Sequence, residues 1–132
     1  METATRSQVR ARAGDRCEYC RIHQRQYVLT FHVEHIVARQ HGGSDDAANL
    51  ALACHACNRY KGPNLAGLDP DTGHLTRLFH PRTDAWTTHF VLQAGRILGR
   101  TPVGRATVQV LNMNQPERVR TRLALEPELF GG

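Results

Sequence analysis

The sequence predicts an α+β protein, and three observations support this fold class. Strand-like apolar segments alternate with short helix-like segments. Four cysteines form two Cys-x2-Cys pairs in the first half, which indicates a metal-stabilised core. Turn residues become frequent from Asn64 onward, so we expect one domain over residues 1–64 and a C-terminal extension over 65–132 that packs on it or beside it.

The first half contains four expected elements. Val9 and Ala13 share one side of a short helix that Gly14-Asp15 ends. Beta-forming residues favour a strand up to His35. The expected elements are a helix over residues 5–13, strands over 26–35 and 49–53, and a helical turn or more over 54–61, closed by Gly62-Pro63.

The second half is predicted to contain a small hairpin and two helices. Ala94-Gly95 is a candidate hairpin turn, and Pro102 suits the first turn of a helix. Trp86 and Phe90 are expected in the core. The expected elements are strands over residues 75–78, 86–93 and 96–100, a helix over 102–113, and a last helix from Pro116 with Val119, Leu123 and Leu125 near its buried side.

The four cysteines are the strongest signal in the sequence. Two cysteines three positions apart can present both sulfurs to one tetrahedral ion. The 33 residues between the pairs exceed the roughly 15–20 of a common zinc ribbon, so the interval holds an insert. The alternatives are a redox Cys-x-x-Cys motif, which needs only one pair, and four buried free cysteines. The predicted ligands of one structural, non-catalytic Zn²⁺ are Cys17, Cys20, Cys54 and Cys57.

The formal charge of +5 and the sequence pI of about 9.5 favour a polyanionic partner. Lys61 is the only lysine among the 17 basic residues, and the arginines suit bidentate phosphate contact. A GC-rich genome would produce the same bias, so the arginines alone do not identify a nucleic-acid-binding protein.

The location of the protein is predicted from apolar runs. The first residues contain none, and no stretch approaches about 20 apolar residues. We therefore expect no secretory signal, no membrane contact and a cytoplasmic location.

A carboxylate stands beside an imidazole in the segment Phe31-His32-Val33-Glu34-His35-Ile36-Val37, at the end of a predicted strand. Phosphodiester hydrolysis needs a nucleophilic water, a base, and positive charge on the phosphate and the leaving oxygen. Histidine is the usual base near neutral pH, and carboxylate or amide oxygens bind a hard divalent metal. The segment therefore favours a hydrolytic site.

Five ordered stretches carry a family resemblance over about residues 15–63. They are Cys-Glu-Tyr-Cys at 17–20, Val-Glu-His-Ile at 33–36, Gly-Gly-Ser-Asp at 42–45, Asn-Leu-Ala-Leu-Ala-Cys at 49–54 and Cys-Asn-Arg-Tyr-Lys-Gly at 57–62. Together they resemble the HNH endonuclease motif of the ββα-metal fold, in a His-Asn-Asn variant. Five matches in order are more specific than any one of them.

The resemblance implies a role for each motif residue. His35 resembles the general base that activates water, and Asn49 resembles the residue that orients this histidine or its loop. Glu34 and Asn58 resemble the ligands of a catalytic divalent metal, Mg²⁺ or Mn²⁺. The acidic position is more often aspartate in the family, so Glu34 is a departure.

Strand geometry conflicts with part of this assignment. Neighbouring side chains on a regular strand point to opposite faces, so Glu34 and His35 could share a site only where the strand ends or distorts. His32 shares a face with Glu34 and is either an additional ligand or, as we prefer, a structural histidine.

Basic residues near the motif are candidates for phosphate contact. Arg59 and Lys61 follow Asn58, and Arg39 follows the catalytic strand. The alternative for Arg59 and Lys61 is a solvated basic face.

These observations predict a metal-dependent endonuclease that hydrolyses DNA, which we expect to be double-stranded. One alternative is a non-catalytic, zinc-stabilised nucleic-acid-binding module, which explains the cysteines and the charge but not the motif residues. A zinc-stabilised adaptor that binds protein is a third possibility.

Overall fold

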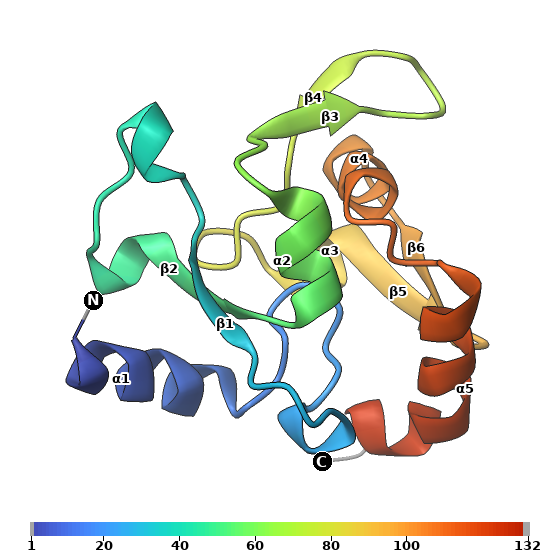
Figure 1. Cartoon of the computed structure of the whole chain (residues 1–132). Helices are drawn as coiled ribbons and strands as arrows, with labels where there is room; N and C mark the ends of the chain where they lie inside the picture. Colours follow the sequence, from blue (N-terminus) through green and yellow to red (C-terminus); the bar gives the residue numbers. More distant parts are fainter. Residues whose placement is uncertain (1, 131–132) are drawn as a thin grey trace.

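The computed structural model describes residues 2–130, with side chains up to Leu125, and its mixture of helices and strands confirms the α+β class (Figure 1). Three short 3-10 helices, η1 (Gln24–Gln26), η2 (Arg39–His41) and η3 (Ala47–Asn49), lie in the loops of the first half. The other elements are α1 (Thr3–Ala13), β1 (His32–His35), β2 (Leu50–Ala53), α2 (His55–Lys61), β3 (Ala66–Leu68), β4 (Leu75–Arg77), α3 (Trp86–His89), β5 (Phe90–Gln93), β6 (Arg96–Gly99), α4 (Pro102–Val110) and α5 (Pro116–Phe130).

The first half forms a ββα unit. Strands β1 and β2 pair antiparallel, with His35 opposite Leu50. Every residue of β2 is buried, because α1 packs against this strand while α2 contacts both strands (Figure 1). The unit therefore brings the end of β1, the start of β2 and the end of α2, where Lys61 donates to the Ile36 carbonyl, into one small region.

Strand β1 is shorter than the predicted strand over 26–35. The Gln24 side chain donates to the Leu29 carbonyl at 2.9 Å and accepts from the Phe31 amide at 2.6 Å. A side chain thus satisfies backbone groups that a longer strand would have paired, and regular pairing begins at His32.

Two further antiparallel hairpins, β3–β4 and β5–β6, form the second half together with α4 and α5. Strand β3 lies in a segment whose turn residues predicted only a loop. The predicted strand over 86–93 is wrong for its first four residues, which form α3. Trp86 and Phe90 are buried at the i, i+4 spacing of a helical turn, and both lie in the core as expected.

The most buried side chains of α5 are arginines. Arg122 is 2% exposed and donates to the Gly95 carbonyl at 2.7 Å. Leu125 packs against the core as expected and Val119 is half-buried, but the expectation for Leu123 is wrong, because this residue is 52% exposed. The helix packs against the β5–β6 turn and the residues that follow α4, whose carbonyl oxygens need donors, and the guanidinium groups satisfy them.

Contacts connect the two halves. The Trp86 indole donates to the Tyr19 carbonyl at 2.7 Å, and Arg82 pairs with Glu18. The division after residue 64 stays a prediction, and residues 1 and 131–132 of the two expected domains lie outside the described part. Within that part, no helix has the length and apolar character that crossing a membrane requires.

Asp69 holds the β3–β4 hairpin against α4. Its carboxylate is fully buried and accepts hydrogen bonds from Arg105 at 2.9 and 2.8 Å. These bonds hold the pKa of Asp69 well below its usual range. The pair therefore stabilises the fold above the unfolded-state pKa of about 3.9, and this contribution is lost as the pH falls through the lower folded-state pKa.

We predict that Asp69→Asn lowers the melting temperature at neutral pH. Below about pH 4, the difference in melting temperature between this variant and wild type should become smaller. Circular dichroism melts of both proteins across this range provide the measurement. Asp71→Asn is the matched control, because Asp71 also contacts Arg105, at 3.1 Å, but is 66% exposed. An equal decrease in melting temperature in the two variants would contradict the prediction.

Candidate functional site

The four predicted cysteine ligands meet in one buried cluster. Their sulfurs lie within 4.8 Å of one another, and those of Cys20 and Cys54 are 3.7 Å apart. One pair lies in the tight turn after α1, and the other lies at the start of α2. Burial raises the pKa of Cys17 and of Cys57, so a divalent cation would be needed to keep all four as thiolates. The cluster could hold a zinc ion, and its four soft ligands fit Zn²⁺.

Arg118 of α5 contacts this cluster. It donates to the Cys57 sulfur at 2.8 Å and, on its other side, to the Leu111 carbonyl at 2.7 Å. Burial opposes its charge, but the neighbouring cysteine sulfurs outweigh burial and raise the pKa of Arg118. The contact ties the second half of the chain to the metal-binding cluster, and no local sequence pattern predicts it.

Glu34 faces the interior of the domain. It is 8% exposed, the Tyr19 hydroxyl donates to one of its oxygens, and the Lys61 ammonium donates to the other at 3.2 Å. Burial raises the pKa of Glu34, although Lys61 opposes this shift. β1 is a regular strand, so Glu34 and His35 point to opposite faces. The carboxylate does not fit a catalytic metal ligand in this arrangement.

Lys61 is 2% exposed and also donates to the Ile36 carbonyl at 2.9 Å. This position corrects the expectation that Lys61 contacts phosphate, because the ammonium group already has three partners inside the protein: Glu34, Ile36 and, at 3.4 Å, the His35 carbonyl. Its charge balances Glu34 instead of facing solvent.

His35 lies on the opposite face of β1, and its side chain is 19% exposed. Its Nε2 is 2.7 Å from an Asp45 carboxylate oxygen, to which Arg39 also donates at 2.9 Å. The hydrogen bonds from His35 and Arg39 lower the pKa of Asp45. Nδ1 of His35 has no hydrogen-bonding partner among the described residues. Asp45 was not predicted as a site residue, although it stands in the matched Gly-Gly-Ser-Asp stretch.

Asn49 shapes the loop that carries Asp45. Its amide accepts from the Val37 amide at 2.9 Å and donates to the carbonyls of Val37 at 2.9 Å and Ser44 at 2.8 Å. A Cβ on Gly43 would lie 1.7 Å from the Val37 carbonyl oxygen, so only glycine permits this close approach. Asn49 thus holds the loop that brings Asp45 to His35.

The other candidates lie on or beside α2. Asn58 is half-buried, and its side chain has no hydrogen-bonding partner in the described part of the chain. Arg59 is exposed, with its guanidinium 5.3 Å from the Tyr60 ring centroid. His32 is exposed, and its Nε2 is 3.3 Å from Nδ1 of His55. The structure therefore brings His35, Asp45 and Arg39 together but keeps Glu34 apart from them.

Comparison with known families bears on this geometry. Residues 17–64 match the family model described as HNH endonuclease, and this range contains the cysteine cluster and His35. We refer to residues 17–64 as the HNH domain, after the family whose model they match. The resemblance drawn from the sequence is confirmed over this segment. Searches of curated proteins and of solved structures found no significant match.

We predict that the purified protein carries about one zinc per chain and that removing it unfolds the HNH domain, because metal binding is coupled to folding. Elemental analysis gives the zinc content, and circular dichroism before and after treatment with a strong chelator gives the loss of structure. Re-addition of Zn²⁺ should restore the spectrum. Folded, freshly purified protein without zinc would contradict the prediction.

Proposed function

We propose that the protein hydrolyses phosphodiester bonds of DNA, with His35 as the general base. The HNH domain indicates a nuclease or a nucleic-acid-binding protein. The observation that favours hydrolysis is the contact of 2.7 Å between His35 Nε2 and the Asp45 carboxylate. A histidine that is partly exposed and held by a carboxylate is a common arrangement for a general base.

The contact assigns roles to the two ring nitrogens. An ionised carboxylate only accepts hydrogen bonds, so Nε2 carries the hydrogen when the imidazole is neutral. The lone pair then lies on Nδ1, the nitrogen without a partner among the described residues. Nδ1 is the atom that takes the proton from the attacking water. Arg39 keeps Asp45 in place, and Asn49 holds the loop between them.

The resemblance implies a catalytic Mg²⁺ or Mn²⁺, which would stabilise charge on the phosphate. Asn58 offers an amide oxygen for this ion, and it stays the proposed protein ligand. Glu34 does not fit, because Tyr19 and Lys61 occupy its two oxygens. The zinc cluster has four sulfur ligands and no open position, so it acts as a scaffold.

A non-catalytic nucleic-acid-binding module is the second candidate function, and the position of Glu34 favours it. A domain whose acidic motif residue forms a buried ion pair could retain the scaffold and lose catalysis. Both candidates use exposed basic side chains such as Arg59 and Arg39 for contact with backbone phosphates of DNA, which we expect to be double-stranded.

We predict that His35→Ala lowers the plasmid cleavage rate by about 10²–10⁴-fold, the usual contribution of a positioned general base, while the fold and the zinc content stay unchanged. Rates are measured across a panel of divalent metals, with zinc content and circular dichroism as controls. His41→Ala is the matched variant, because His41 is exposed on the following loop, and it should cut like wild type.

A folded, zinc-loaded His35→Ala protein that cuts at the wild-type rate would end this mechanism. Wild-type protein that binds DNA but cuts with no divalent metal would favour the non-catalytic module.

Asp45 and Asp46 are neighbouring exposed aspartates, but only the Asp45 carboxylate contacts His35. Asp45→Asn should lower kcat by about tenfold or more, but less than the roughly 10⁴-fold loss seen when the aspartate of a buried catalytic triad is changed. KM should change little, because Asp45 orients the base and does not bind DNA. Asp46→Asn should change neither constant. Equal kinetic effects of the two substitutions would refute the positioning role.

A further inference from the structure

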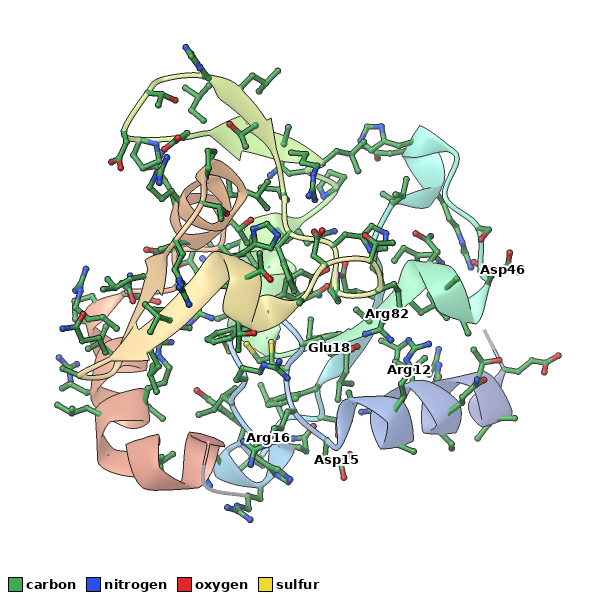
Figure 2. All side chains as sticks on the ribbon, turned by 180° about the vertical axis from the view of Figure 1, so that it is seen from behind. Arg12, Asp15, Arg16, Glu18, Asp46 and Arg82 are labelled. Carbon is green, nitrogen blue, oxygen red and sulfur yellow. The ribbon has the colours of Figure 1, made fainter. Side chains whose placement is uncertain are left out.

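A cavity of about 110 Å³ lies between α1, the first cysteine pair and the segment around Trp86. Three arginines line it, Arg12, Arg16 and Arg21, and we call it the arginine cavity. Figure 2 shows the side chains of Arg12 and Arg82 approaching each other beside Glu18, the residue that pairs with Arg82. Guanidinium groups from separate parts of the chain therefore gather around one small polar space.

The carboxylates at this cavity already have partners. Glu18 pairs with Arg82 and also accepts from the Leu52 amide at 2.8 Å. Asp84, the other acidic residue of the lining, accepts from Arg77 at 2.7 Å. Positive charge therefore exceeds negative charge in the cavity.

The guanidinium groups also repel one another. Burial lowers the pKa of Arg82, and the charge of Arg12 lowers it further. An anion between Arg12 and Arg82 would offset this repulsion.

Two donors in or beside the cavity lack acceptors. Arg21 lines the cavity, and Arg82 pairs with Glu18 of its lining. The Nε atoms of both arginines are buried and have no hydrogen-bonding partner among the described residues. A buried donor without an acceptor is unfavourable, and an anionic oxygen would supply the strongest kind of acceptor. The planar guanidinium matches the spacing of phosphate oxygens.

The cavity lies close to the proposed catalytic histidine. Arg12 donates to the Ala47 carbonyl at 3.0 Å and to the Leu50 carbonyl at 2.7 Å, so it contacts the start of β2. Leu50 is the residue paired with His35 on β1. A strand of nucleic acid at His35 could thus reach the arginine cavity with another of its phosphates.

We propose that the arginine cavity binds a backbone phosphate of the nucleic acid other than the one that is hydrolysed. This inference rests on the proposed function, because it assigns the cavity to the same substrate. A phosphate held there would fix the position of the strand relative to His35 without reading its sequence.

Trp86 allows anion binding in the cavity to be measured by fluorescence. It is the only tryptophan of the chain, it lines the cavity, and its ring centroid is 5.3 Å from the Arg21 guanidinium carbon. Inorganic phosphate titrated into the zinc-loaded full chain, with chloride at matched ionic strength as control, should give a saturable change in fluorescence. Arg21→Gln should lose this response, whereas Arg96→Gln, an exposed arginine of β6, should keep it.

Arg21→Lys keeps the charge but removes the buried Nε donor, and it should bind phosphate more weakly than wild type. This variant serves as the test if Arg21→Gln does not fold or load zinc. No phosphate response in wild type, or a wild-type response in the Arg21 variants, would overturn the site.

The nucleic-acid assignment is tested with a duplex oligonucleotide in a His35→Ala background that does not cut it. Arg21→Gln should lower the affinity about tenfold and reduce the slope of log K against log salt by about one phosphate contact, whereas Arg96→Gln should leave both unchanged. Phosphate binding without an effect of Arg21→Gln on the oligonucleotide would overturn the backbone assignment and indicate a site for free phosphate. Neither measurement reads cleavage, so failure here is distinguishable from failure of the His35 mechanism.

Discussion

The convergence of four cysteine sulfurs within 4.8 Å is the constraint on which the rest of the HNH domain depends. One pair precedes β1, and the other follows β2 at the start of α2. Joining the pairs at one point closes the 33 residues between them into a loop. Within this loop β1 and β2 pair antiparallel, and α2 begins at the cysteine cluster. A zinc ion there would contribute folding free energy to a unit whose strands have only four residues each. The position of His35 at the end of β1 follows from this closure.

Features with a local signature could be predicted from the sequence. The spacing of the cysteines, the apolar run of β2 and the Gly62-Pro63 end of α2 each depend on neighbouring residues, and each was expected correctly. The match of residues 17–64 to the HNH family model was also expected, because five short stretches occur in order. The side-chain partners of the candidate site residues were not predicted, since these partners come from other segments. Asp45 is ten residues from His35 and reaches it only because Asn49 and Gly43 fold the loop back.

Where the local sequence pattern is ambiguous, long-range contacts determine the secondary structure and the buried face of a segment. Residues 86–89 have the β-formers of a strand, but burial of Trp86 and its hydrogen bond to Tyr19 favour the helical turn. The apolar residues of α5 suggested its buried face, but the carbonyls of Leu111 and Gly95 are satisfied by Arg118 and Arg122. Propensity could not reveal these outcomes, because the competing partners are far away in sequence.

The net charge of the chain overstates the positive charge available to nucleic acid. Seventeen basic residues gave the first indication of a polyanionic partner, yet Lys61, Arg118 and Arg122 are buried and bond to groups of the protein itself. What distinguishes a contact with nucleic acid is where a cation lies and whether its donors are already used. Arg59 is exposed on α2, Arg39 is exposed but uses two of its donors on Asp45, and Arg21 of the arginine cavity keeps a donor without an acceptor among the described residues. The case for a nucleic-acid substrate therefore depends on these few positions and not on the total charge.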